Sequence, residues 1–229
     1  MERLLLFDID GTLLRANRAG REMLGESLQV VYGTAGAIDT FDFAGRTDRG
    51  MIMDLLQGAG LDSVTIEAQL PELYEEMNRQ GRRLFNSDRI KACEGVPELL
   101  AALQQKSDVL LGLLTGNIAD TALLKLHAAG INPMTFRIGA FGSDSVERNE
   151  LLLIAWQRAR ETTGIMFSGA NTTIIGDTPA DIVCAQNGLA RSVAVATGWH
   201  TRDRLFQYGP DHLFDDLSHT DTVLGVLLA

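Results

Sequence analysis

Residues 1–14 read MERLLLFDIDGTLL, in which an apolar run ends directly at a pair of carboxylates. The continuous hydrophobicity of residues 4–7 predicts a strand that is buried on both faces, as in a parallel sheet. Because residues two apart in an extended chain face the same side, we expect the carboxylates of Asp8 and Asp10 to converge. Gly11 would permit a turn close to a ligand. A solvated acidic loop fits D-x-D equally well, so the choice depends on the other strands.

Four more short apolar runs end in glycine or polar residues, and amphipathic stretches lie between them. The expected strands cover residues 108–117, 136–142, 172–177 and 192–198. Most of the helical stretches end shortly before a glycine, as helices commonly do. They cover residues 96–105, 119–129, 149–161 and 179–186. This alternation predicts an α/β fold in which helices flank a parallel sheet and the crossovers are right-handed.

Residues 16–90 break the alternation because they contain no clear buried strand. Their segments have the pattern of amphipathic helices, with apolar and polar residues on opposite faces. We therefore predict two domains. Residues 1–15 and 91–229 would form the α/β core, and residues 16–90 would form a small all-helical cap inserted into it.

Polar residues gather where further expected strands end. Asp177 and Asp181 follow one strand, and Thr115, Gly116 and Asn117 follow another. Carboxylates are hard oxygen ligands that favour Mg²⁺, and a hydroxyl with backbone N–H groups suits a phosphate oxygen. Ordinary helix caps would use the same residue types. Because ligands bind beyond the carboxyl ends of strands in an open parallel sheet, a shared site is the stronger interpretation.

The overall composition restricts the partners. The 229 residues carry a net charge of −10, and no block of basic residues provides the positive potential that nucleic-acid binding needs. An anionic substrate must therefore meet a strong local cation. No apolar run approaches a membrane span, and the N-terminus lacks the pattern of a signal peptide, so we expect a soluble, cytoplasmic protein without a membrane partner. The choice between monomer and homodimer does not follow from the sequence.

The motifs DIDGTLL, LLTGN and GDTPADI occur in this order and resemble three of the four motifs of the haloacid dehalogenase (HAD) superfamily. The resemblance covers nearly the whole chain, since a helical cap after the first motif is a feature of HAD hydrolases similar to phosphoglycolate phosphatases and β-phosphoglucomutases. It implies a Rossmann-like core, Mg²⁺ as the cofactor and a small phosphorylated metabolite as the substrate.

The resemblance also implies roles for the acidic motif residues. Asp8 would be the nucleophile that forms an aspartyl-phosphate. Asp10 would protonate the leaving oxygen and then activate the water that hydrolyses this intermediate. Mg²⁺ would be held by Asp8, by the backbone carbonyl of Asp10 and by Asp177, with Asp181 in support. The metal would neutralise the repulsion between a carboxylate and a phosphate dianion.

The second and third motifs would hold the phosphate. Thr115 and the N–H groups of Gly116 or Asn117 would bind the transferring phosphoryl oxygens. The third motif normally supplies a lysine, but no lysine follows Lys125 in this chain. Arg148 is the best substitute, because a guanidinium stays charged and can bind a carboxylate and a phosphate together. The alternative is a surface arginine at the start of a helix.

The segment FAGRTDRGM at residues 43–51 is the most polar, glycine-containing turn of the expected cap. The resemblance places cap residues of this kind over the active site, which makes Arg46 and Thr47 candidates to contact the leaving group. A helix-capping turn with solvated arginines explains the segment equally well.

These features favour a phosphatase that acts on a small organic phosphomonoester. A sugar phosphomutase of the β-phosphoglucomutase kind has the same motifs and remains an alternative, as does a non-catalytic phosphate-binding protein. A dehalogenase needs no Mg²⁺, and the acidic set of Asp10, Asp177 and Asp181 argues against it. A phosphonatase is disfavoured because the cap contains no lysine for a Schiff base.

Overall fold

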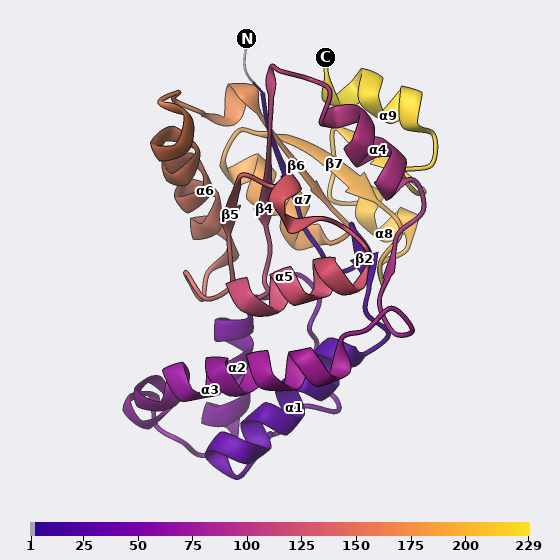
Figure 1. Cartoon of the computed structure of the whole chain (residues 1–229). Coiled ribbons are helices and arrows are strands. Elements are labelled where there is room, and N and C mark those ends of the chain that lie inside the picture. The colour runs from indigo at the N-terminus through magenta and orange to yellow at the C-terminus, as the bar shows by residue number, and fades with distance from the viewer. Residues whose placement is uncertain (1–2) are drawn as a thin grey trace.

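The computed structural model describes residues 3–229, with a six-stranded sheet at the centre of an α/β core (Figure 1). The strand order is β5-β4-β1-β6-β7-β8, and every neighbouring pair is parallel. The strands are β1 (Arg3–Phe7), β4 (Val109–Leu114), β5 (Ile138–Ala140), β6 (Thr172–Gly176), β7 (Arg191–Val195) and β8 (His212–Phe214). The predicted α/β fold with a Rossmann-like parallel sheet is confirmed.

Strand β1 lies in the middle of the sheet because both of its faces are apolar. Leu4 and Leu6 pack on one face, Leu5 and Phe7 pack on the other, and all four side chains are fully buried. Each such side chain stabilises the fold by about 1.5–3 kcal/mol when it leaves water. The chain that follows β1 therefore emerges at the centre of the carboxyl edge, between the ends of β4 and β6.

Helices cover both faces of the sheet. One face packs against α4, α5 and α9 in a cluster that includes Leu5 and Leu113. The other packs against α6 and α7 in a cluster that includes Leu6 and Ala155. The core helices are α4 (Val96–Leu103), α5 (Ala119–Ala128), α6 (Arg148–Thr163), α7 (Pro179–Asn187), α8 (Arg202–Phe206) and α9 (Thr220–Leu227), with 3-10 turns η1 (Pro133–Thr135) and η2 (Gly169–Asn171).

The structure differs from the sequence-based expectation at the two edges of the sheet. The strand expected over residues 136–142 is limited to Ile138–Ala140, because Phe136 closes η1 by donating its N–H to the Pro133 carbonyl. Strand β8 was not expected. It has only three residues, all half-buried, and gives too short a pattern to recognise in the sequence.

The predicted helical insertion after the first motif is also confirmed, and it lies against the carboxyl edge of the sheet (Figure 1). It consists of α1 (Ala19–Tyr32), α2 (Asp48–Gly58) and α3 (Ser63–Leu84). Helix α3 begins where the Asp62 side chain accepts a hydrogen bond from Thr65 N at 3.0 Å, as an N-cap does. The insert leaves and rejoins the core through an antiparallel ribbon of β2 (Leu14–Arg15) and β3 (Lys91–Ala92).

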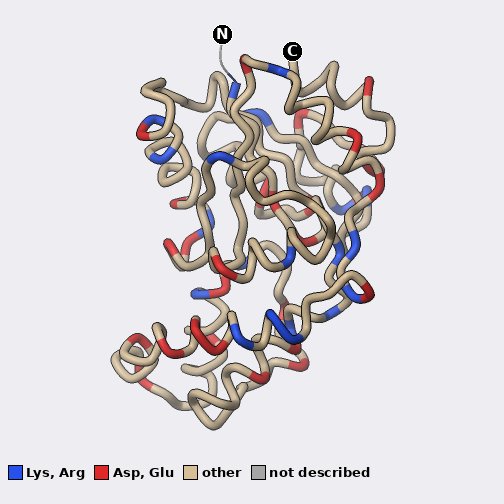
Figure 2. The backbone as a smooth tube through the Cα atoms, viewed as in Figure 1, with Lys and Arg blue, Asp and Glu red and all other residues tan. Residues whose placement is uncertain are grey.

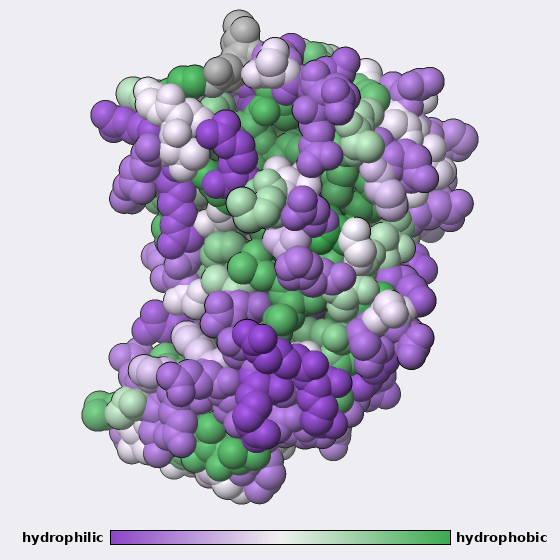
Figure 3. Space-filling view, in the orientation of Figure 1, coloured by the Kyte–Doolittle hydropathy of each residue, from purple (hydrophilic) through white to green (hydrophobic). Residues whose placement is uncertain are grey.

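The surface carries charges of both signs. Figure 2 shows acidic and basic residues interspersed over the core and the insert. Hydrophilic side chains cover α3 on the face shown in Figure 3, which agrees with its amphipathic sequence. Among residues 3–229, none of the helices has both the length and the apolar character needed to span a bilayer.

Candidate active site

The chain turns immediately after β1. Asp8 N–H still donates to the Ile175 carbonyl of β6 at 2.9 Å. The Ile9 carbonyl then accepts a hydrogen bond from Leu13 N at 2.9 Å, which closes a tight turn. The chain therefore turns at Asp10 instead of staying extended. Asp8 and Asp10 line the same cavity, and their carboxylates bind different partners.

Three buried carboxylates form an acidic triad at the ends of β1 and β6. Oxygen atoms of Asp8, Asp177 and Asp181 all lie within 4.8 Å of one another. Thr12 Oγ1 donates to Asp177 Oδ1 at 3.1 Å. Asp181 also caps α7, because its Oδ2 accepts from the N–H and the hydroxyl of Thr178 at 3.0 and 2.6 Å. The Asp181 side chain therefore caps α7 and belongs to the acidic triad as well.

The triad is electrostatically unfavourable by itself. Burial raises the pKa of Asp8 to about 6, although Arg148 opposes the shift. Burial and the charges of Asp8 and Asp181 raise the pKa of Asp177 well above its ordinary value. Neighbouring carboxylates in a dry site ionise together only when a cation compensates them. Three converging hard oxygen donors fit a divalent cation such as Mg²⁺.

Arg148 is the cation that the structure places beside Asp8. It begins α6, is 8% exposed, and its guanidinium lies 3.2 Å from Asp8 Oδ2 while it also pairs with Asp181. Within residues 3–229, its Nε is a buried donor without a hydrogen-bond partner. A buried donor of this kind next to Asp8 fits an anionic ligand such as a phosphoryl oxygen.

A second charge cluster holds Asp10. Lys125 Nζ lies 2.6 Å from Asp10 Oδ2 and 2.6 Å from Asn117 Oδ1, and Asn117 Nδ2 donates to the same Asp10 oxygen at 2.8 Å. The Lys125 side chain is 5% exposed, whereas the Asp10 side chain is 40% exposed. Asp10 is therefore fixed by two donors and still accessible.

Sequence reasoning missed Lys125, which lies upstream of the third motif where the family's lysine is expected. One signal could have found it. Lys125 lies within the expected helix over residues 119–129, at i+4 from Thr121 and i+3 from Ala122, which places it on the buried face of α5. A lysine on the buried face of a helix needs an acidic partner, which here is Asp10.

The loop after β4 contributes to the same site. Thr115 is fully buried, and its hydroxyl accepts hydrogen bonds from the backbone N and the Nδ2 of Asn117 at 3.3 and 2.9 Å. Gly116 has no room for a side chain, since a Cβ would lie 1.9 Å from the Arg46 carbonyl oxygen. A cavity between the core and the insert is lined by all three predicted residues of this loop, Thr115, Gly116 and Asn117.

The two cap candidates are placed differently. Arg46 lines the cavity, pairs with Asp54, and its guanidinium lies 4.9 Å from the centre of the Phe41 ring. Thr47 is 1% exposed and does not line the cavity. Its hydroxyl accepts from Gly50 N and donates to the Val146 carbonyl. Its hydroxyl therefore caps α2 and links this helix to the segment before α6, and we do not retain Thr47 as a substrate contact.

The cavity lies between the core and the insert. It measures about 600 Å³ and is lined by residues of both charge clusters together with Phe43 and Trp199. Trp199 is a large aromatic residue, yet 82% of its surface is exposed to solvent. A hollow of this size accommodates a small organic molecule.

A family model described as haloacid dehalogenase-like hydrolase matches residues 5–195. The chain belongs to this family. The match spans β1 to β7 and includes every side chain of the two charge clusters.

Several known proteins are similar to this HAD-like hydrolase over nearly their whole length. Pyrophosphatase PpaX from Bacillus pumilus is 26% identical, covering 96% of this chain and 95% of PpaX. A hydrolase structure from Pseudomonas syringae has a TM-score of 0.72 at 21% identity, covering 98% and 99% of the two chains. A predicted phosphoglycolate phosphatase from Haemophilus somnus has a TM-score of 0.69 at 18% identity, covering 97% of each chain. A protein described as a β-phosphoglucomutase from Thermotoga maritima has a TM-score of 0.61 at 18% identity, covering 99% of each.

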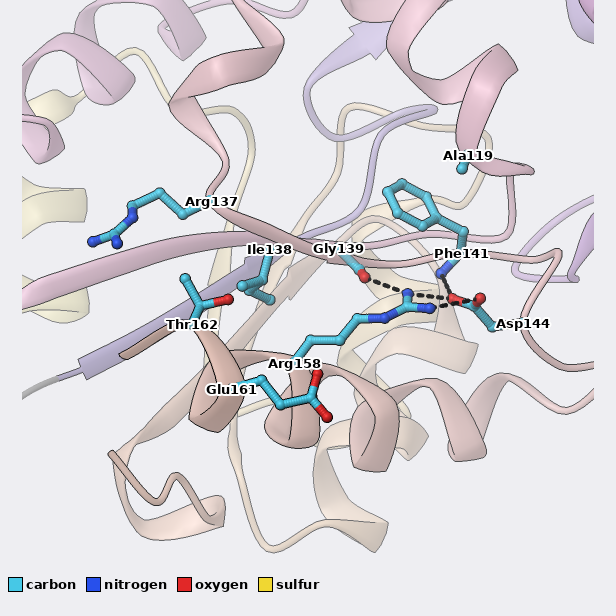
Figure 4. Close-up of a pocket in the computed structure, with 9 residues that line it drawn as sticks. All are labelled: Ala119, Arg137, Ile138, Gly139, Phe141, Asp144, Arg158, Glu161 and Thr162. Atoms are coloured by element: carbon cyan, nitrogen blue, oxygen red, sulfur yellow. Dashed lines mark hydrogen bonds and ion pairs between the residues drawn. The ribbon is translucent and has the colours of Figure 1, made fainter. Parts of the chain in front are cut away.

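The HAD-like hydrolase has a further hollow beside edge strand β5. Figure 4 shows Arg158 pointing into it, between the Gly139 carbonyl and the Asp144 carboxylate. The guanidinium lies 2.6 Å from Gly139 O and 2.6 and 2.9 Å from the two Asp144 oxygens. Asp144 also accepts from Phe141 N at 2.9 Å. These bonds hold the loop after β5 in place. We therefore assign Arg158 and Asp144 a structural role.

The first prediction concerns Gly11, whose φ is +87° and where an added Cβ would lie 2.3 Å from Asp177 Oδ2. Gly11→Ala is expected to displace the Asp177 carboxylate and weaken Mg²⁺ binding by roughly 10- to 100-fold. Gly60→Ala is the matched control, because Gly60 has a φ of +93° but open space around it. Both variants should lose about 1–3 kcal/mol of unfolding free energy through backbone strain. Calorimetric Mg²⁺ titration of both checks this, and unchanged affinity in Gly11→Ala would contradict the steric argument.

The second prediction concerns pH. Because the pKa of Asp8 is raised to about 6 in the metal-free hydrolase, protons compete with Mg²⁺ below that pH. The apparent Mg²⁺ affinity should fall below about pH 6 by roughly tenfold per pH unit for each proton displaced, and Asp177, whose pKa is also raised, adds to the protons displaced from Asp8. Titration calorimetry in buffers of different ionisation enthalpy measures both quantities. Equal affinity at about pH 5 and about pH 7 is the result that this account does not allow.

Proposed function

We propose that this hydrolase is a Mg²⁺-dependent phosphatase that cleaves a small organic phosphomonoester through an aspartyl-phosphate on Asp8. The observation that carries the proposal is the separation of two charge clusters. Asp8 belongs to the acidic triad and lies beside Arg148, whereas Asp10 lies beside Lys125. Two carboxylates in different environments can serve as nucleophile and as proton carrier in one reaction.

The first half-reaction transfers the phosphoryl group to the protein. An Asp8 oxygen bonds to phosphorus while the bond between phosphorus and the leaving oxygen breaks. Asp10, in its protonated form, gives its proton to the leaving oxygen. Arg148 directs its unpartnered Nε at the phosphoryl oxygens, and Thr115 together with the Gly116 N–H binds them from the β4 side.

The second half-reaction restores Asp8. Asp10, now ionised beside Lys125, takes a proton from water, whose oxygen bonds to phosphorus as the bond from phosphorus to Asp8 breaks. Inorganic phosphate leaves, and Asp10 again carries a proton. The bonds from Lys125 and Asn117 hold Asp10 in one place for both transfers.

The acidic triad fits the metal that the family uses. Asp8 and Asp177 would hold Mg²⁺ through their carboxylates and Asp10 through its backbone carbonyl, with Asp181 in support. When bound, the ion neutralises the repulsion between Asp8 and the phosphate dianion. The raised pKa values of Asp8 and Asp177 support this assignment, because burial makes their ionised forms unfavourable unless a cation compensates the charge.

Our proposal includes the division into a core of residues 1–15 and 91–229 and a cap of residues 16–90. The ribbon of β2 and β3 supports this division, since Leu14 pairs with Ala92 where the chain crosses. The cap would select the substrate, with Arg46 toward the leaving group. A small phosphorylated metabolite would fit the cavity of about 600 Å³.

The similar proteins suggest three kinds of substrate: an organic phosphomonoester, inorganic pyrophosphate and a sugar phosphate. The name of PpaX makes inorganic pyrophosphate a specific candidate. A sugar phosphomutase would use the same first half-reaction and return the phosphoryl group to a sugar rather than to water. Product analysis with a hexose 1-phosphate separates the two: inorganic phosphate means hydrolysis, and a hexose 6-phosphate means mutase activity.

The third prediction tests the reaction class. With Mg²⁺, the protein should release inorganic phosphate from at least one member of a panel of organic phosphates and pyrophosphate. EDTA should abolish the release, and Asp8→Asn should lower it by at least about 10⁴-fold because an amide oxygen is a poor nucleophile. A phosphate-release assay measures this. Turnover that survives both changes would reject the mechanism, and failure of the whole panel would favour a non-catalytic phosphate-binding protein.

The fourth prediction tests the third-motif cation. Arg148→Ala should lower kcat/KM by about 10²–10³-fold, since it removes a charged donor from the developing charge. Arg148→Lys should recover part of the loss, because a lysine keeps the charge but not the fork of donors. Arg79→Ala is the control, as Arg79 is an exposed arginine of the insert that pairs with Glu76. Near-normal hydrolysis by Arg148→Ala would reject this role.

A further inference from the structure

The start of α2 is bonded directly to the core. Asp48 N donates to the Gly116 carbonyl at 2.7 Å, and Arg49 N donates to the Gly142 carbonyl at 3.3 Å. The first N–H groups of a helix have no partner inside the helix. In this insert two of them are satisfied by carbonyls of the loops after β4 and β5. Docking of the insert therefore completes the hydrogen bonding of α2.

The backbone of Asp48 donates to the core, whereas its side chain accepts a hydrogen bond from the core, at the start of α5. Its Oδ2 accepts a hydrogen bond from Ile118 N at 2.9 Å, and Ile118 is the N-cap residue of α5. The residue is 7% exposed. A carboxylate at a helix N-terminus interacts favourably with the helix dipole, which offsets the cost of its burial. Asp48 thus supplies from the insert the cap that α5 lacks in its own side chains.

Two glycines, Gly116 and Gly142, allow the backbone of the insert to approach the backbone of the core. A Cβ on Gly142 would lie 1.8 Å from the Gly116 carbonyl oxygen and 2.9 Å from Asp48 N. The backbones of α2, the loop after β4 and the loop after β5 are therefore in direct contact. Arg158 fixes the last of these loops through Asp144, as Figure 4 shows.

Ile118, which donates to Asp48, lies next to the second charge cluster around Asp10. Ile118 follows Asn117, which donates to Asp10, and α5 then carries Lys125 to the same carboxylate. Lys125 and Asp10 are also charges that act on Asp48, the first attracting its ionised form and the second repelling it. A chain of short contacts thus runs from the insert to the proton carrier.

We propose that Asp48 is a positioning residue that fixes the start of α5, so that Asn117 and Lys125 hold Asp10 in its proton-transferring geometry only while the insert is docked. The inference rests on the proposed function, because it assumes that Asp10 carries the proton. It links substrate enclosure to acid catalysis. With the insert displaced, α5 loses its cap and Asp10 loses its fixed donors.

The test compares leaving groups. A nitrophenyl phosphate releases a stable anion that needs little protonation, whereas glycerol 2-phosphate releases an alkoxide that needs a proton. Asp48→Ala should lower kcat/KM for glycerol 2-phosphate about 10- to 100-fold more than for nitrophenyl phosphate. We compare kcat/KM because it reports the steps up to departure of the leaving group. Asp48→Asn should fall between, since its amide oxygen can still accept from Ile118 N.

The control is Asp39→Asn, which removes an exposed carboxylate from the insert and should leave both rates unchanged. Equal losses on both substrates in Asp48→Ala, or no loss on either, would overturn the proposal. If the unmodified protein hydrolyses neither substrate, hydrogen exchange decides the contact itself, and the proposed function fails only if no member of the wider panel is hydrolysed. The amides of residues 117–119 should then exchange faster in Asp48→Ala than in the unmodified protein, and unchanged exchange would overturn the positioning role.

Discussion

The compensation of buried negative charge at the centre of the sheet is the constraint on which this structure depends. Asp8, Asp177 and Asp181 converge because β1 and β6 are adjacent parallel strands that end at the same edge. Arg148 provides one positive charge against three carboxylates. Burial raises the pKa values of Asp8 and Asp177, and repulsion from the neighbouring carboxylates adds to the shift at Asp177, whereas Arg148 opposes the shift at Asp8. The site therefore favours a further positive charge.

A second pair of charges separates the roles of the two motif carboxylates. The turn after Ile9 brings Asp10 to Lys125, whereas Asp8 lies beside Arg148. One carboxylate is then buried among like charges, whereas the other is accessible and paired with a cation. The two carboxylates therefore have different partners, which allows one to act as the nucleophile and the other as the proton carrier. The insert takes part in this separation through Asp48, which binds the helix that carries Lys125.

Most of the fold and part of the site could be predicted from residue patterns. Continuous apolar runs predicted five of the six sheet strands, because strands buried on both faces leave a strong local signal. Strand β8 left none, since it is short and half-buried. The pairing of Arg148 with Asp8 could be expected from the need for a cation. The bonds of the Thr47 hydroxyl to Gly50 and Val146 could be recognised only from the structure.

The sequence by itself determined the chemical inventory: the D-x-D pair after a buried strand, the distant G-D-x-x-x-D segment, and the helical character of the insert. Only the tertiary structure decided which charges meet. Asp10 and Lys125 are 115 residues apart, and Asp48 and Ile118 are 70 residues apart. Local patterns report which face of an element is buried, but a contact between distant segments depends on how the sheet and the insert pack together, and that packing has no local signature.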